Sequence, residues 1–237
     1  IIGLFRLWWI PAGQPAGEDA YVRYDHEAII GVLALEAERA GAVIIGEDLG
    51  NVEPWVHSYL HERGILGTSI LWFESTGHGV PRPAEQWRRD CLASVTTHDL
   101  PPTVGYLAGE HVRMRAELGL LTRPIGEERA ADDAAKARWL DALVAAGLLD
   151  RSAAGDPHEV VVALHRFLAR TPARLRCVAL TDLVGERRTQ NQPGTLDEYP
   201  NWRVPLGGPD GAPVLLDEVV AANLGADVLA AVQSRPD

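Results

Sequence analysis

Short apolar runs along the chain predict five β-strands. One run, rich in β-branched residues and bounded by Gly41 and Gly50, ends at Glu47. A run of this kind is typical of a strand buried on both faces of a parallel sheet. The other runs lie at 1–10, 68–73, 92–97 and 176–181. The segment 11–24 holds several Pro and Gly residues among short polar ones, so we expect a loop there.

Between the strands, apolar residues recur every three or four positions, which is the period of an amphipathic helix. This spacing predicts helices over 25–41, 54–64, 84–89 and 217–233. The alanine-rich stretch 108–168 predicts an inserted helical subdomain, in which Asp156-Pro157 starts a helix. Strands separated by helices indicate right-handed βαβ units around a parallel sheet. The sequence therefore predicts an α/β fold in three parts: strand–helix units over 1–107, a helical insertion over 108–170, and a last strand, a polar loop and a C-terminal helix over 171–237.

The charge of the chain narrows the partners that we expect. The formal net charge is −11, and 46% of the residues are hydrophobic, a composition that predicts a folded protein. A nucleic-acid backbone or an anionic membrane rewards clustered Lys and Arg, which an acidic protein does not offer. We therefore expect no nucleic acid and no membrane as partner, and a neutral or cationic ligand instead.

The cysteines and the first residues indicate a cytoplasmic protein. Cys91 and Cys177 stand far apart in apolar contexts, so we expect two buried thiols in a reducing compartment. Residues 1–10 lack the basic start and the cleavage site of a secretory signal, and no apolar stretch is long enough to cross a bilayer. These patterns predict neither a cofactor nor a metal ion.

Carboxylates follow three of the predicted strands: Glu47, Asp99 next to His98, and Asp182. Ligands of parallel sheets and α/β barrels bind outside the carboxyl ends of the strands. Glu47 is therefore a candidate acid or base, although a carboxylate there could equally cap the next helix, and the pattern favours this capping role for Asp48. One strand-end carboxylate most often holds a loop, whereas several on successive strands point to a site. Cleavage of a glycosidic bond needs a carboxylic acid and a carboxylate, and Glu47 and Asp99 could supply them.

Two other functions fit the pattern less well. A metal hydrolase could combine Glu47, Asp48 and the His98-Asp99 pair with His57 and His61, which have i, i+4 spacing. That histidine pair lacks the glutamate that follows the first histidine in zinc proteases, and a solvated helix face explains both residues. A nucleotide-binding module would need a Walker lysine loop or a G-x-G-x-x-G after a strand, and the sequence has neither.

Several motifs in the chain resemble those of one known family. GLFRLWWIPAG, IIGEDLG, TTHDLPPT and NQPGT followed by NWR are similar to the matching segments of the 4-α-glucanotransferases, the amylomaltases or disproportionating enzymes of the α-amylase clan. The similarity runs in the family's order from residue 1 to about residue 206. Each motif is weak alone, but the ordered set is specific. The resemblance implies a (β/α)8 TIM barrel and a retaining mechanism that moves a segment of α-1,4-glucan (a maltodextrin) onto a glucose or maltodextrin acceptor.

The resemblance also implies roles for individual residues. Glu47 matches the general acid/base, and burial near other carboxylates would favour its protonated form. Asp99 matches the aspartate that holds the reacting glucose and stabilises the transition state. His98 and Asn191 match residues that contact sugar, and we group Asp48 with them as a candidate substrate-binding residue.

Aromatic rings suit the apolar faces of glucose, and the chain has seven Trp. Trp202 lies in a polar loop and is the candidate sugar platform, with a place in the core as the alternative. Trp8, Trp9 and Trp72 lie in strand-like runs, so we expect them in the core.

One departure from the family limits the expected activity. The resemblance places the nucleophile, an aspartate in an arginine-x-aspartate-histidine motif, just upstream of Ile1 and thus outside these residues, together with the first barrel strands. We therefore expect a C-terminal portion of the barrel with a helical insertion, inactive by itself. The alternative from another class is a non-catalytic carbohydrate-binding or regulatory protein that keeps the sugar site.

Overall fold

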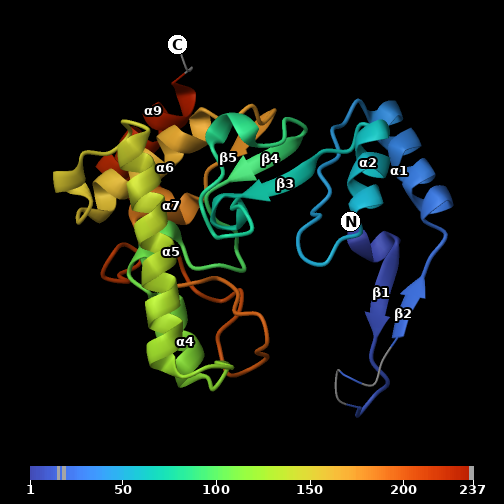
Figure 1. Ribbon diagram of the computed structural model, residues 1–237, viewed down its shortest axis with the longest axis horizontal. Coiled ribbons are helices and arrows are strands. Elements are labelled where there is room, and N and C mark those ends of the chain that lie inside the picture. The colour runs from blue at the N-terminus through green and yellow to red at the C-terminus, as the bar shows by residue number, and fades with distance from the viewer. Residues whose placement is uncertain (15–16, 18–19, 235–237) are drawn as a thin grey trace. The chain divides into compact units, whose positions relative to one another are not determined.

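The computed structural model describes residues 1–14, 17 and 20–234. The chain divides into two compact units. The first unit comprises Ile1–Ser69 and Arg88–Leu92, and the second comprises Ile70–Trp87 and Ala93–Asp237. Both contain helices and strands, so the fold is α/β (Figure 1). The predicted three-part division at residues 107 and 170 stays a prediction.

The first unit holds a β-hairpin followed by two helices. Its elements are the 3-10 helix Ile2–Leu4, β1 (Arg6–Trp9), β2 (Ala20–Arg23), α1 (His26–Ala40) and α2 (Pro54–Glu62). β1 and β2 pair antiparallel, with Leu7 opposite Val22. α1 has the predicted ends. Asp25 accepts a hydrogen bond from the backbone N–H of Ala28 at 3.2 Å, and Gly41 follows the helix with φ 61°, a conformation that glycine adopts without penalty.

The core of the first unit forms where the 3-10 helix Ile2–Leu4 and the following Phe5 meet α1 and α2. Its buried residues are Phe5, Ile30, Val56, Leu60 and Ile65. Burial of side chains of this size stabilises a fold by about 1.5–3 kcal/mol each. The helical periodicity that predicted α1 and α2 therefore also identifies the faces that pack together.

Three expectations for the first unit are wrong. Segment 43–47 forms no regular strand: Ile45 makes one isolated parallel bridge to Leu66, and Val43 is 66% exposed. Ile45 is also exposed, so the run is not buried on both faces. The segment 11–24, expected to be a loop, contains β2. Trp8 and Trp9 are exposed on the hairpin instead of buried in the core.

The second unit is mainly helical. A three-stranded sheet with the order β3-β4-β5 is built from β3 (Gly67–Ile70), β4 (Cys91–Ser94) and β5 (Leu175–Cys177), and β3 and β4 begin in the first unit. The 3-10 helices are Leu71–Phe73, Ala84–Gln86 and Arg151–Ala153. The α-helices are α3 (Thr103–Leu107), α4 (Glu110–Glu117), α5 (Ile125–Ala145), α6 (Pro157–Ala169), α7 (Leu180–Val184), α8 (Leu216–Ala221) and α9 (Asn223–Gln233).

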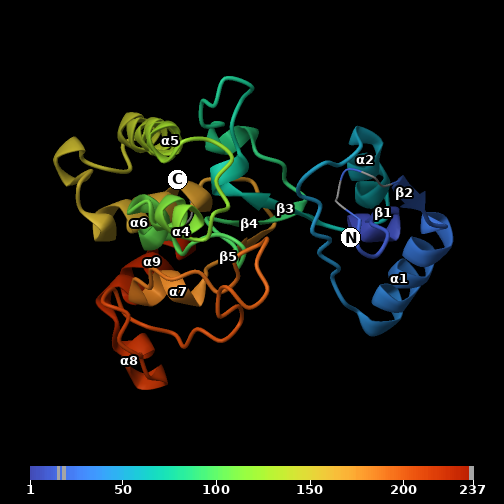
Figure 2. The same ribbon diagram turned by 90° about the horizontal axis from the view of Figure 1, so that it is seen from below.

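Helix α6 is the centre of the second unit. It starts as predicted, because Asp156 accepts a hydrogen bond from the backbone N–H of His158 at 2.9 Å and Pro157 follows as the first helical residue. Most of its residues are buried. α9 lies beside α6 in both views (Figures 1 and 2), and Val161 packs in one cluster with Val228. The predicted helical segment 108–168 therefore exists as α4, α5 and α6.

Other expectations for the second unit need correction. The predicted strand 176–181 is β5 followed by α7, so Asp182 lies in a helix and not at a strand end. The predicted strands 68–73 and 92–97 stop at Ile70 and Ser94, and the predicted helix 217–233 is divided into α8 and α9. Cys91 is buried as expected, but Cys177 is exposed. Trp72 is half-buried and stacks on the ring of Tyr106 at 4.1 Å.

Candidate functional site

Four of the predicted site residues lie together in the second unit. Asn191 donates a hydrogen bond from Nδ2 to Oδ1 of Asp99 at 2.6 Å. The Nε2 atom of His98 lies 3.4 Å from Oδ2 of Asp99, and the ring of His98 lies 5.0 Å from that of Trp202. The side chains of His98, Asp99 and Trp202 are exposed to solvent. The cluster therefore offers a carboxylate, an amide, an imidazole and an indole to a ligand from outside.

Backbone hydrogen bonds hold the two segments of this cluster in register. The backbone N–H of Asn191 donates to the carbonyl of His98 at 3.1 Å, and Oγ1 of Thr189 donates to the carbonyl of Leu100 at 3.1 Å. The side chain of Asn201 accepts a hydrogen bond from the backbone N–H of Gln192 at 2.8 Å. The loop after β4 and the polar loop 189–203 thus form one scaffold, although they are about 90 residues apart in the chain.

Trp202 has an unusual backbone conformation. Its φ is 62°, and among the described residues it is the only non-glycine residue with a positive φ. A bulky side chain in this region costs on the order of 1–3 kcal/mol, and such residues cluster at functional sites. The backbone N–H of Trp202 donates to the carbonyl of Gln190 at 2.8 Å, which fixes the loop in this conformation. The indole, 63% exposed, is thus held beside His98 instead of in the core.

Glu47 belongs to the first unit and is exposed. Its carboxylate accepts a hydrogen bond from the backbone N–H of Leu49 at 2.7 Å. The helix that follows has Glu53 as its N-cap residue, so Glu47 stabilises a turn and does not cap α2. Glu47 is thus exposed where the sequence led us to expect burial.

Asp48 has a different environment from its neighbour. It is buried, and both of its oxygens accept hydrogen bonds from the guanidinium of Arg88, at 2.6 and 2.8 Å. The backbone N–H of Thr68 and Nδ1 of His57 also lie 2.9 Å from its oxygens. Burial by itself raises the pKa of Asp48, but the hydrogen bonds from Arg88 and Thr68 outweigh it and hold the pKa below its usual range. Asp48 therefore neither caps the next helix nor has an oxygen left for substrate.

A tetrapeptide with the order arginine-x-aspartate-histidine occurs at 23–26. Its Asp25 is the N-cap of α1, as described above. The ring of His26 stacks against that of Phe5 at 4.9 Å in the core. This tetrapeptide thus has a structural role, and it lies downstream of the GLFRLWWIPAG motif, whereas the resemblance places the nucleophile upstream.

The remaining histidines and carboxylates do not form a larger cluster. Nδ1 of His61 lies 3.1 Å from Oδ2 of Asp90, while His57 contacts Asp48. Within residues 1–14, 17 and 20–234, no group of three or more His, Cys, Asp or Glu side chains is close enough to hold a metal ion. In the same residues, no helix has both the length and the apolar character needed to cross a membrane.

Asp182 lies in a buried polar cluster that the sequence did not reveal. Its oxygens accept hydrogen bonds from the backbone N–H and the hydroxyl of Thr103, at 2.8 and 2.6 Å. His165 is completely buried: Nδ1 donates to the carbonyl of Val161 at 2.8 Å, and Nε2 lies 3.7 Å from Asp182. Burial raises the pKa of Asp182, against the opposing effects of the His165 charge and the Thr103 hydrogen bonds. The cluster ties α3, α6 and α7 together inside the second unit.

Two substitutions of Asp182 should distinguish the contribution of its hydrogen bonds to stability from the contribution of its charge. Asp182→Ala leaves both Thr103 donors without an acceptor and should lower the free energy of unfolding by about 2–5 kcal/mol. Asp182→Asn keeps an acceptor and offers an N–H to Nε2 of His165, so it should stay within about 1 kcal/mol of wild type. Hydrogen exchange at α3 and α7 measures both effects.

The two variants should also differ from wild type in their pH dependence. Because the pKa of Asp182 is raised in the folded state, the stability that it adds is complete below its unfolded value and is lost as pH rises through the folded pKa. The Asn variant lacks this loss, so its stability relative to wild type should increase with pH. Equal pH profiles for wild type and the Asn variant would show that folding does not shift the pKa of Asp182.

Comparisons with known proteins identify the family. A family model described as 4-alpha-glucanotransferase matches residues 1–209. The 4-alpha-glucanotransferase of Mycobacterium tuberculosis (strain H37Rv) is 60% identical over 99% of this chain and 33% of that protein. The enzyme of the same name from Haemophilus influenzae is 32% identical over 88% of this chain and 31% of that protein. The chain thus spans about a third of the length of these curated relatives.

Solved structures agree with the sequence comparison. The amylomaltase from Corynebacterium glutamicum superposes with a TM-score of 0.91 at 47% identity, over 98% of this chain and 34% of that chain. An amylomaltase from Streptococcus agalactiae in complex with acarbose superposes with a TM-score of 0.65 at 16% identity, over 99% of this chain and 40% of that chain. At the latter identity the likeness shows the fold alone. The resemblance found in the motifs is confirmed, and the chain belongs to the 4-alpha-glucanotransferase family.

Proposed function

We propose that this chain forms part of a 4-α-glucanotransferase, in which it supplies the acid/base and the sugar-holding residues for transfer of α-1,4-glucan segments to glucose or a maltodextrin. The observation that carries the proposal is the cluster of His98, Asp99, Asn191 and Trp202 in a chain of this family. In the proposed fold, the chain contributes part of a (β/α)8 barrel, and the parallel bridge between Ile45 and Leu66 is consistent with it.

Each residue of the cluster has a role that follows from its chemistry. The Asp99 carboxylate accepts hydrogen bonds from glucose hydroxyls and, being anionic, stabilises positive charge at the anomeric carbon in the transition state. Asn191 orients this carboxylate through its 2.6 Å hydrogen bond and contacts the same sugar. His98 donates a further hydrogen bond, and the Trp202 indole covers the apolar face of a glucose ring.

Glu47 is the proposed proton donor and acceptor. In a retaining reaction, the acid protonates the leaving glycosidic oxygen and then deprotonates the acceptor hydroxyl in the second step. Glu47 lies in a turn whose geometry is fixed by its hydrogen bond to Leu49, and its carboxylate is exposed to a substrate. Asp48 is a positioning residue. Its hydrogen bonds with Arg88 and Thr68 fix the chain directly after Glu47.

A chimeric enzyme tests the proposal directly. The chain replaces the matching segment of the Mycobacterium tuberculosis relative, to which it is 60% identical, and the chimera is incubated with maltotriose. We expect release of glucose together with longer maltodextrins, at a rate comparable to that of the relative. A folded chimera that binds maltotriose without transfer would contradict the proposal and favour the non-catalytic carbohydrate-binding alternative.

A further inference from the structure

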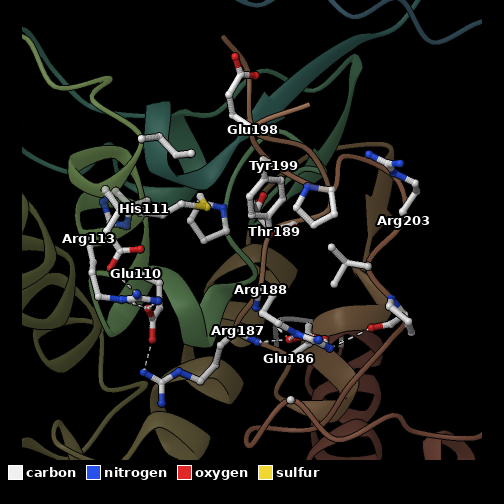
Figure 3. A pocket seen from close by; sticks show the side chains of 18 of the residues that line it. Glu110, His111, Arg113, Glu186, Arg187, Arg188, Thr189, Glu198, Tyr199 and Arg203 are labelled. Carbon is white, nitrogen blue, oxygen red and sulfur yellow. Dashed lines mark hydrogen bonds and ion pairs between the residues drawn. The ribbon is translucent and has the colours of Figure 1, made fainter. Parts of the chain in front are cut away.

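The second unit contains a large pocket that is lined in part by the loop that carries Asn191 and Trp202. Its volume is about 610 Å³, within the range of pockets that hold small molecules. Helix α4 forms one wall, the segment 186–189 after α7 forms the base, and the loop residues 198–200, 203–205 and 209–211 form the rest (Figure 3). Neither Glu47 nor any residue of the sugar cluster lines this pocket.

Most charged side chains of the pocket are paired with one another. Glu110 binds Arg113 at 2.8 Å and Arg187 at 2.6 Å (Figure 3). Arg188 binds the completely buried Glu186 at 2.6 Å. Burial raises the pKa of Glu110 and of Glu186, but the interactions with the arginines outweigh it and hold the pKa of both carboxyls below its usual range. An anionic ligand would compete with these carboxylates for the arginines, so the pocket favours a neutral polar ligand.

The apolar surface of the pocket consists of flat rings and flexible side chains. Tyr199 and prolines 101, 200, 205 and 209 line it together with Met114 and Leu118. The phenol of Tyr199 donates to the carbonyl of Thr189 at 2.7 Å, which fixes the plane of the ring. Rings of this kind pack against the C–H faces of sugars, while the paired charges and backbone groups around them bind hydroxyls. The combination fits a neutral oligosaccharide.

The pocket and the sugar cluster share a short piece of backbone. Thr189 is buried and bonds to Tyr199 of the pocket through its carbonyl. The hydroxyl of Thr189 lies 3.0 Å from the carbonyl of Asn191. The side chain of the same asparagine binds Asp99. At the other end of the loop, Arg203 lines the pocket while the preceding Trp202 stands beside His98. A ligand that packs against Tyr199 and Arg203 therefore stabilises the loop conformation that the sugar cluster needs.

We propose that this pocket is a second, non-catalytic binding site for a neutral α-glucan, which stabilises the loop 189–203 in its site-forming conformation. The choice of α-glucan as the ligand rests on the proposed function. The location of the site and its link to Asn191 rest on the hydrogen bonds and the lining residues given above.

The sequence provides a specific probe for the pocket. Met114 is its only methionine, so a chain labelled with methyl-13C methionine gives one methyl signal that reports on the pocket. We expect this signal to shift and saturate during titration of the 237-residue chain with maltotriose. The indole of Trp202, labelled with fluorine and assigned through Trp202→Phe, reports on the sugar cluster in the same titration.

Two substitutions test which residues bind. Tyr199→Leu removes the ring and should weaken the binding seen by Met114 by about tenfold or more. Arg203 is exposed, so Arg203→Ala should leave the fold intact and weaken this binding by about threefold to tenfold. Asn191→Ala changes only the sugar cluster, so the affinity reported by Met114 should stay within about twofold.

The outcomes distinguish this inference from the proposed function. A Trp202 signal that responds to maltotriose while the Met114 signal does not would overturn the second site and leave the proposed function intact. If neither signal responds, the second site is overturned, and transfer by the chimeric enzyme decides the proposed function separately. If inorganic phosphate shifts the Met114 signal at lower concentration than maltotriose, the pocket is an anion site, and the assignment of a neutral ligand is wrong.

Discussion

Replacement of Glu47 by glutamine should reduce transfer from maltotriose by about 10²- to 10⁴-fold in the chimeric enzyme, the range that general acid–base catalysis contributes. Glutamine has the same size and can still accept the hydrogen bond from the backbone N–H of Leu49, so the turn is preserved. It cannot give a proton to the leaving oxygen or take one from the acceptor. The initial rate of glucose release from maltotriose measures the loss.

A donor with a different leaving group makes this test specific for proton donation. An α-maltosyl fluoride donor releases fluoride, which departs without protonation, so the first step should be affected far less by Glu47→Gln than it is with maltotriose. Glu53→Gln is the matched control, because Glu53 lies close in the sequence and forms an ion pair with Arg6 at 2.8 Å. This control should change the rate by less than about twofold. Full transfer activity in Glu47→Gln would remove the acid/base role.

Helix ends could be predicted from the sequence because their determinants are local. Asp25 and Gly41 bound α1, and Asp156 with Pro157 starts α6, through hydrogen bonds and dihedral angles that involve only near neighbours. The end of a strand depends instead on which other segments pair with it. The apolar run at 43–47 has a single parallel bridge, and no pattern within the run shows how many neighbours it will have.

The predicted strand 176–181 shows a second kind of ambiguity. Its apolar residues continue into Leu183 and Val184, and so short a run fits a strand and a buried helix equally well. The structure ends β5 at Cys177 and starts α7 at Leu180. The carboxylate of Asp182 consequently faces Thr103 inside the unit, so it is unavailable to a ligand.

Residues of the candidate site could be predicted from the sequence where they lie in the family's motifs. Two separate motifs, TTHDLPPT and NQPGT, contain His98, Asp99 and Asn191, and hydrogen bonds bring these motifs together in the second unit. The environment of Asp48 could not be predicted, because its partner Arg88 lies 40 residues away and no local pattern links the two residues. The second pocket was missed for the same reason: Glu110, Arg187 and Tyr199 lie in three separate segments.

Removal of the Asp48 carboxylate should have the largest effect on the stability of the first unit. Asp48→Ala leaves Arg88 without its bidentate partner and the backbone N–H of Thr68 without an acceptor. Loss of one member of a buried ion pair costs about 3–5 kcal/mol, and we expect the lower end because the Arg88 side chain is 35% exposed. Hydrogen exchange measured at α2 and β3 localises the loss to this unit, whereas Glu62→Ala, at an exposed position, should change exchange there by less than about 0.5 kcal/mol.

The pH dependence of this variant follows from the lowered pKa of Asp48. Because the folded pKa lies below the ordinary value of 3.8, the stability that Asp48 adds is complete above that value and is lost as pH falls through the folded pKa. The difference in stability between wild type and Asp48→Ala should therefore be constant from neutral pH to about pH 5 and shrink below about pH 4. A difference that stays constant down to pH 2 would show that the interaction does not depend on the charge of Asp48. In that case the hydrogen bond from Thr68, which a protonated carboxyl can still accept, would account for the stabilisation.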